Sequence, residues 1–354
     1  MRRPPTLLPP NAVSPSQAKE LVRCLAADQS VLLLAPPGVG KSALVAQAAK
    51  ESGLEVRSLL GTQIAPEDVS GVPRVVNERA VFCPPRALLG DGRPFCLFLD
   101  ELPASPPDVQ KAFYSLLLER RIGEFALPKG TWVVAAGNRS EDRAIIRTMS
   151  SALVNRVFVV LLKVDKSEWL AWAVTAGVRN DIRGFVSHMP GVLQRPVPPD
   201  PVPFSTPRSW ALLSRDLDLA EAAGRLNPDE RRAMAFGRVS PQDASLFCTL
   251  CEDGLAELRE PVEFLDHPEW MPPSDTGKWF LVSRIRGAVA GNLFAPPASA
   301  TEPELTASRE KATAFLLSFP EEFRFALLVD HVRQWADLGA SDAMLAALRD
   351  VTGV

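Results

Sequence analysis

The stretch that decides the fold is Val31-Leu-Leu-Leu-Ala-Pro-Pro-Gly38-Val-Gly-Lys41-Ser42. Its first four residues are apolar and predict a strand that is buried on both faces of a sheet. The Pro- and Gly-rich residues that follow predict a tight loop, and Lys41 and Ser42 open a helix. Backbone N–H groups of such a loop, together with the helix N-terminus, form a cradle for phosphate.

This stretch follows the P-loop pattern, with Ala35 standing where the first Gly is usual. The alternative is an ordinary Gly-rich turn, which the strand before it and the helix after it disfavour. Lys41 is expected to reach the β- and γ-phosphates, and the Ser42 hydroxyl to bind Mg²⁺. The expected ligands are therefore the phosphates of a nucleotide and Mg²⁺. The candidate nucleotide contacts are Ala35, Pro36, Pro37, Gly38, Val39, Gly40, Lys41 and Ser42.

Four more short apolar runs predict strands on either side of this motif, and helical stretches separate them. With the first run they give five candidate strands, at residues 31–34, 56–60, 95–99, 132–136 and 157–162. Arg57 and Ser58 interrupt the second run, as expected of an edge strand. Strands that alternate with helices predict an α/β fold in which a parallel five-stranded sheet has helices on both faces.

Polar residues end two of these strands. Asp100 and Glu101 follow 95–99, where a hydrophobic strand ending in two acids is typical of a Walker B motif. Asp100 is then a Mg²⁺ ligand, and Glu101 polarises the attacking water. The alternative is a pair of acids that caps the next helix. Asn138 follows 132–136 and is a candidate contact of the water or the γ-phosphate, unless Gly137-Asn138 only forms a turn.

Two arginines are candidates for charge stabilisation of the phosphates. Arg156, just before the last strand, fits an arginine finger that acts in a neighbouring subunit, because its planar donor set suits developing phosphate charge. Arg139, Arg143 and Arg147 lie near it and compete for this role. Arg208 follows Thr206-Pro207 at a helix start and is expected to reach the nucleotide. The alternatives are a helix-dipole contact for Arg156 and a surface position for Arg208.

Composition narrows the function further. The chain has 39 basic and 42 acidic residues, a net charge of −3, which disfavours nucleic acid as a partner. No apolar run approaches the roughly 18 residues of a membrane span, and the N-terminus does not resemble a signal peptide. Five scattered cysteines fit a cytoplasmic protein. The Cys248/Cys251 pair has metal-site spacing, but packing in a helix core is favoured because no second pair follows.

After about residue 163 the pattern is helical, and prolines mark the linkers. The chain has 33 prolines among its 354 residues, several of them at the N-terminus and near residues 194–207. We expect a disordered tail over 1–12, an α/β nucleotide-binding domain over 13–164, a helical lid over 165–240 and a C-terminal helical region over 241–354.

In this order, the motifs resemble those of AAA+ ATPases, most of all the MoxR family of the helix-2-insert clade. The resemblance covers about residues 12–220. It rests on 35–42, 65–71, Asp100-Glu101-Leu102, 116–121 and Thr206-Pro207-Arg208. Ser150-Ser151, where an acidic residue is common, and an unusual sequence over 137–144 indicate a divergent branch.

The resemblance implies a P-loop NTPase fold and an ATP-dependent hexameric ring that remodels protein. Asn138 takes the sensor 1 position, Arg156 the finger and Arg208 sensor 2. Residues 66–88 resemble the clade's insert, with a hairpin over 72–82 directed at the central pore. A protein with a von Willebrand factor A domain is the implied partner. The alternatives are a nucleic-acid motor or loader and a scaffold that only binds nucleotide.

Overall fold

The computed structural model describes residues 11–85, 88, 92–122, 124–139, 149, 151–189, 191–254, 263–290 and 301–328. The chain forms two compact units, one from residues 1–175 and 193–211, the other from 176–192 and 212–354. The first ten residues of the expected tail, Arg143 and Arg147 lie outside the described residues, as does the stretch 329–354. The expected domain boundaries near 165 and 240 stay predictions.

The first unit is built on a five-stranded parallel sheet, as predicted. Its order is β2-β5-β8-β1-β9. The strand β1, which precedes the predicted phosphate-binding loop, therefore lies between β8 and the edge strand β9. Each predicted strand agrees with the structure to within one residue, and β2 is at an edge. The strands are β1 (Val31–Leu34), β2 (Val56–Leu60), β5 (Cys96–Asp100), β8 (Trp132–Gly137) and β9 (Phe158–Leu161).

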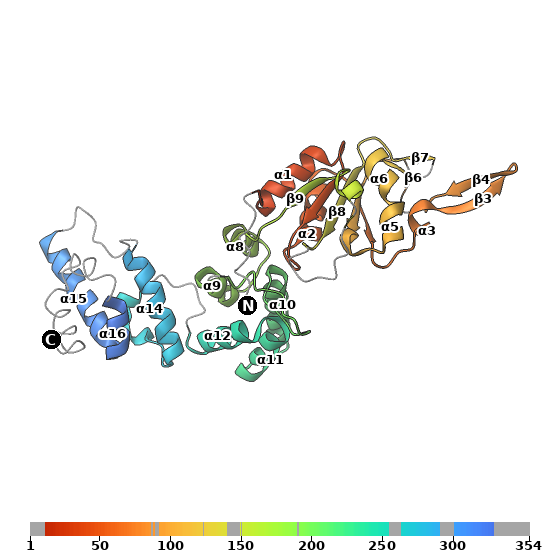
Figure 1. Ribbon diagram of the computed structural model, residues 1–354. Coiled ribbons are helices and arrows are strands. Elements are labelled where there is room, and N and C mark those ends of the chain that lie inside the picture. Colours follow the sequence, from red (N-terminus) through yellow and green to blue (C-terminus); the bar gives the residue numbers. More distant parts are fainter. Residues whose placement is uncertain are drawn as a thin grey trace. The chain divides into compact units, whose positions relative to one another are not determined.

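Helices cover both faces of the sheet (Figure 1). Because side chains alternate along a strand, Leu33 and Val134 point to one face while Leu32 and Val133 point to the other. The first face packs against α1 (Pro15–Leu25) and α2 (Lys41–Glu51). The second packs against α5 (Pro107–Ala112), α6 (Tyr114–Glu119) and α7 (Ser151–Val154). Two apolar layers thus hold the strand ends in fixed register.

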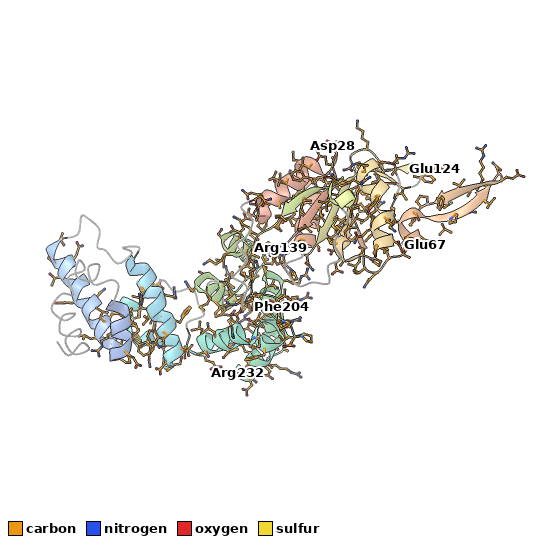
Figure 2. All side chains as sticks on the ribbon, in the orientation of Figure 1. Asp28, Glu67, Glu124, Arg139, Phe204 and Arg232 are labelled. Carbon is orange, nitrogen blue, oxygen red and sulfur yellow. The ribbon has the colours of Figure 1, made fainter. Side chains whose placement is uncertain are left out.

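The predicted hairpin is present and projects from the first unit (Figure 1). It leaves the short helix α3 (Glu67–Ser70), which the label of Glu67 marks in Figure 2, and pairs β3 (Val72–Val76) with β4 (Arg79–Cys83). Its turn residues have positive φ, 50° at Asn77 and 61° at Glu78, as the turns that suit twisted hairpins require. Every β3 side chain is exposed, so the hairpin contributes little to the core. A smaller hairpin joins β6 (Arg121–Ile122) to β7 (Phe125–Ala126).

The start of α1 is fixed by contacts with α8 (Lys166–Thr175). Ser14 and Gln17 form a capping box. The Glu168 carboxylate of α8 accepts hydrogen bonds from the Ser14 hydroxyl and from the Ser16 N–H, the latter at 2.8 Å. One carboxylate therefore joins the first helix of the unit to its last.

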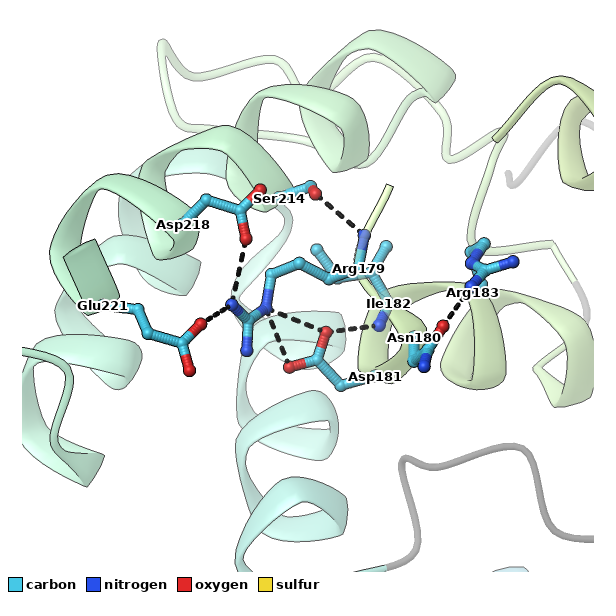
Figure 3. A network of polar contacts seen from close by, with 8 residues as sticks. All are labelled: Arg179, Asn180, Asp181, Ile182, Arg183, Ser214, Asp218 and Glu221. Carbon is cyan, nitrogen blue, oxygen red and sulfur yellow. Dashed lines mark hydrogen bonds and ion pairs between the residues drawn. The ribbon is translucent and has the colours of Figure 1, made fainter. Parts of the chain in front are cut away.

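The second unit is helical, as predicted. Figure 3 shows how Arg179 fixes α9 to α10: its guanidinium pairs with Asp181, with Asp218 at 3.0 Å and with Glu221, and its backbone N–H donates to Ser214 at 3.0 Å. Its helices are α9 (Asn180–His188), α10 (Pro207–Ala222, whose first turn belongs to the first unit), α11 (Pro228–Arg238), α12 (Pro241–Glu252), α13 (Glu263–Asp266), α14 (Asp275–Ala290), α15 (Glu302–Ser318) and α16 (Glu321–Leu328).

Candidate functional site

The predicted phosphate-binding loop joins β1 to α2. Gly38 and Gly40 have φ values of +76° and +98°, a region that costs a residue with a Cβ about 1–2 kcal/mol. Gly40 is the N-cap of α2, and Lys41 and Ser42 are the first two helical residues. The loop therefore places the N-terminus of α2 at the carboxyl edge of the sheet, where parallel sheets bind ligands.

Lys41 and Asn138 meet at this edge. The Lys41 side chain is buried, and its Nζ donates to the carbonyl oxygens of Ala35 at 3.1 Å and Pro36 at 3.2 Å and to Asn138 Oδ1 at 2.9 Å. Asn138 reaches it because β8, which it follows, pairs directly with β1. These three acceptors are neutral oxygen atoms.

Ser42 and Asp100 also come together, as the sequence predicts of two Mg²⁺ ligands. The Ser42 hydroxyl donates to Asp100 Oδ2 at 3.1 Å. Mg²⁺ takes oxygen ligands and is usually held by one or two protein groups together with waters and phosphate oxygens. A hydroxyl and a carboxylate side by side fit that requirement. Among the described residues, no group of three or more His, Cys, Asp or Glu side chains is placed to hold a metal ion.

Glu101 lies beside Asp100 in an unusual backbone conformation. Its φ of 55° and ψ of 30° place it in the left-handed region, which non-glycine residues adopt infrequently. The chain then turns into the short 3-10 helix Leu102–Ala104. The exposed Glu101 carboxylate accepts a hydrogen bond from Thr62 Oγ1 at 3.0 Å. Backbone strain held in place by surrounding structure is typical of functional positions.

Thr62 is a site residue that the sequence analysis missed. It follows β2, and β2 pairs with β5 in the register Leu60 opposite Asp100, which brings the two strand ends together. Gly61 makes the close passage possible, because a Cβ there would lie 2.1 Å from Ser105 Oγ. The only signal available from sequence was a hydroxyl residue just beyond a strand end, which is too common to single out.

The segment before α10 packs on the phosphate-binding loop. The Arg208 backbone N–H donates to the Gly38 carbonyl at 3.0 Å, and a Cβ on Gly38 would lie 2.5 Å from Thr206 Oγ1. Ser205 and Thr206 are buried, whereas Arg208 is exposed. Arg208 therefore begins next to the loop it was predicted to serve, within the same compact unit.

Arg156 lies apart from this group of residues. It precedes β9, and Phe158 at the start of β9 is level with Val31 at the start of β1. The phosphate-binding loop begins beyond Leu34, three residues or about 10 Å further along the strands. The backbone of Arg156 is thus at the opposite edge of the sheet. Its guanidinium lies over the ring of Tyr114, 5.3 Å from the ring centroid.

The remaining candidates behave as packing residues. Cys248 is buried in α12, and burial raises the pKa of its thiol; burial also raises the pKa of Cys251, as expected of cysteines in a helix core. Burial likewise raises the pKa of Cys96 in β5 to about 12. None of the helices in the described part of the chain is both long and apolar enough for a membrane span.

Comparison with known proteins agrees with this geometry. Residues 31–163 match the family described as ATPase family associated with various cellular activities (AAA), so the first unit contains an AAA domain. No protein with a curated description matches the chain.

Solved structures give weaker similarities. The RuvB Holliday junction branch migration motor of Thermotoga maritima is 16% identical, with a TM-score of 0.40 over 83% of this chain and 86% of that one. A single-substitution variant of the same motor is 15% identical, with a TM-score of 0.41 over 85% of this chain and 92% of that one.

Proposed function

We propose that this protein binds and hydrolyses ATP with Mg²⁺. The observation that carries the proposal is the convergence of two residue pairs, Lys41 with Asn138 and Ser42 with Asp100, at the carboxyl edge of the sheet. One pair offers a buried positive charge and a polar amide, and the other offers oxygen ligands. A triphosphate together with a divalent cation satisfies both pairs at once, and the AAA match supports this assignment.

Each residue has a role that follows from its chemistry. Lys41 and the loop N–H groups from Gly38 to Ser42 bind the phosphates, and Asn138 orients the γ-phosphate or the water. Glu101 takes a proton from the attacking water, with its carboxylate held by Thr62. Mg²⁺, when bound by Ser42 and Asp100, neutralises charge on the phosphate oxygens. We expect Arg208, at the start of α10, to contact the nucleotide.

Two variants test this assignment. Lys41→Ala should lose ATP binding, whereas Glu101→Gln should bind ATP and lose turnover, because an amide cannot accept the proton. Isothermal titration and phosphate release measure the two properties separately. Lys129→Ala and Glu124→Gln are matched controls, since both side chains are exposed on the same unit away from the loop. If Glu101→Gln hydrolyses ATP at the parent rate, Glu101 is not the base.

We further propose that the active form is a homo-oligomeric ring, a hexamer by resemblance to MoxR proteins. Arg156 begins at the edge of the sheet away from its own phosphate-binding loop, which favours a role in a neighbouring subunit. Apolar side chains around it are exposed: Val154 by 42%, Phe158 by 41% and Val159 by 36%. Exposed apolar side chains close in sequence to a candidate finger fit contact with a second copy of the chain.

The client that we propose is a protein, remodelled in the cytoplasm and presented by a partner with a von Willebrand factor A domain. The hairpin offers exposed Val75 (81%) and Val72 (61%) for such contacts. A nucleic-acid motor is the second candidate, because Arg74 and Arg79 lie on the same hairpin. A nucleotide-gated scaffold is the third. Phosphate release with and without duplex DNA separates them: stimulation by DNA favours the motor, and binding without turnover favours the scaffold.

A further inference from the structure

Tyr114 and Arg156 form a contact that the proposed reaction does not yet use. The Arg156 guanidinium carbon lies over the Tyr114 ring at 5.3 Å from its centroid, within the range of a cation–π interaction. Tyr114 begins α6, whereas Arg156 lies between α7 and β9. Neither their spacing in the sequence nor the AAA match indicates that the two side chains are in contact.

The Tyr114 ring is a fixed platform. It packs against the core layer that includes Phe113, Leu116 and Leu153, all of which are buried. Leu153 also ties Arg156 to α7, because the Arg156 N–H donates to the Leu153 carbonyl at 3.0 Å. The ring and the backbone of the arginine are therefore anchored in the same layer of side chains.

A ring contact of this kind suits a residue that must meet a phosphate in another subunit. A cation–π contact uses the charge of the guanidinium and takes up none of its N–H donors, so it is compatible with hydrogen bonds from those donors to a phosphate. It also restricts a long side chain before binding, which lowers the entropy lost when the arginine meets its target. A mobile arginine would lose that freedom at each encounter.

We propose that Tyr114 is the positioning residue that holds Arg156 ready for the nucleotide of a neighbouring subunit. This inference rests on the proposed finger role of Arg156. It predicts that Tyr114 acts through the finger and not through the ATP pocket of its own subunit. Replacing the ring by an aliphatic side chain should lower kcat about 3- to 30-fold and leave KM for ATP unchanged. Tyr114→Phe keeps the aromatic face and should stay within about twofold of wild type.

Rescue in trans is the decisive experiment. Tyr114→Leu subunits have a sound pocket and a misplaced finger, whereas Glu101→Gln subunits have a dead pocket and a sound finger. Adding Glu101→Gln subunits in excess should restore the turnover of each Tyr114→Leu pocket to that of wild-type pockets mixed in the same way. Thermal unfolding of Tyr114→Leu and Tyr114→Phe, measured alongside, shows whether either variant is folded.

Arg156→Ala mixed with Glu101→Gln is the matched control, because it removes the finger outright. If that control is rescued but folded Tyr114→Leu is not, or if Tyr114→Leu alone has the wild-type kcat, the positioning role is wrong and the finger stands. If Arg156→Ala alone hydrolyses at the wild-type rate, the finger role is wrong and the positioning role falls with it.

The chain also offers a direct readout. Tyr114 is its one tyrosine, so incorporation of 3-fluorotyrosine gives a single fluorine resonance. Arg156→Ala should shift that resonance in the nucleotide-free protein, and Arg156→Lys should shift it less. A slowly hydrolysed ATP analogue should leave the wild-type resonance away from its position in Arg156→Ala, because the arginine keeps its ring contact when it meets the phosphate. A resonance that Arg156→Ala leaves unchanged would overturn the contact itself.

Discussion

At the scale of single residues, the Glu101 carboxylate is held by a side-chain contact from Thr62, the one that the described part of the chain shows. Its backbone is held by neighbouring bonds, such as the one from the Glu101 N–H to Asp100 Oδ1 at 3.0 Å. The side chain itself is exposed, and the Thr62 hydroxyl is the group that holds it. Aiming of the base is therefore separable from its backbone conformation.

Thr62→Val should lower kcat about fivefold to tenfold while leaving ATP affinity unchanged. The reason is that one hydrogen bond to a carboxylate is worth about 1–1.5 kcal/mol, and the phosphate contacts are untouched. Steady-state phosphate release and ATP titration measure both quantities. Thr62→Ser keeps the hydroxyl and is the control. If Thr62→Val is as fast as the parent or faster, the bond restrains the base instead of aiming it.

A comparison of Gly38 with Gly40 separates the effect of backbone strain on stability from the effect of packing. Gly38→Ala and Gly40→Ala both place a Cβ at positive φ and should each cost about 1–2 kcal/mol of unfolding free energy. Only at Gly38 does the Cβ also meet Thr206, whereas at Gly40 nothing lies within 4 Å. Gly38→Ala should therefore be the less stable variant in urea unfolding without nucleotide. Equal stabilities would mean that Thr206 does not pack on the loop in solution.

The site residues differ in whether the neighbouring sequence alone was enough to predict them. The phosphate-binding loop was predictable because its conformation depends on its own glycines and on the strand and helix that flank it. Asp100 and Asn138 were predictable because each is a polar residue at the end of an apolar strand. Thr62 and Tyr114 were not predictable, since their contacts require knowing that β2 lies beside β5 and how α6 packs.

At the scale of elements, apolar continuity was a sufficient signal for the buried strands and a poor one for short segments. Each strand of the central sheet was predicted to within one residue. For the inner strands β1, β5 and β8 the reason is that a strand buried on both faces needs an unbroken apolar run, whereas the run of the edge strand β2 is interrupted by Arg57 and Ser58. The pattern after residue 163 predicted helices in general but did not single out α9 (Asn180–His188), whose apolar residues cover little more than two turns. The two-residue strands β6 and β7 are too short for any period to appear.

Hydrogen bonds from Ser14 and Ser16 to the Glu168 carboxylate join α1 to α8, and we call this group of contacts the clasp. The clasp should make the free energy of unfolding depend on pH. Burial raises the pKa of Glu168, but hydrogen bonds from Ser14 and Ser16 outweigh it, so the pKa lies below its ordinary value of about 4.3. A lowered pKa in the folded state means that the carboxylate stabilises the fold at neutral pH. That contribution is lost as the pH falls through the folded pKa, because the unfolded state then binds the proton more readily.

Glu168→Gln should therefore cost about 1 kcal/mol at pH 7 and little near pH 3, which makes its stability curve flatter over that interval. Urea unfolding at several pH values measures the difference. Glu20→Gln is the control, because Glu20 is an exposed carboxylate on α1 that pairs only weakly with Arg23, at 3.4 Å. A constant difference between parent and Glu168→Gln from pH 7 to pH 3 would contradict the clasp.

At the scale of the whole molecule, the position of β9 suits contact with a neighbouring subunit close to the nucleotide site. Its exposed apolar residues flank Arg156, and the opposite edge of β9 is paired with β1, which leads into the phosphate-binding loop. If ATP is contacted by Lys41 of one subunit and Arg156 of the next, it binds the assembled form more tightly than the separated chains. Mass action then makes assembly depend on nucleotide.

A slowly hydrolysed ATP analogue with Mg²⁺ should therefore raise the molar mass measured by light scattering at micromolar protein. Phe158→Ser should weaken that response, because it removes an apolar side chain that is 41% exposed at the proposed contact. Leu219→Ser is the matched control: Leu219 is 61% exposed on α10, away from β9 in sequence and in the other compact unit. Nucleotide titration confirms that Phe158→Ser still binds the analogue.

A parent protein that stays monomeric with saturating analogue would contradict the ring, whereas equal assembly of the two variants would place the contact elsewhere on the molecule.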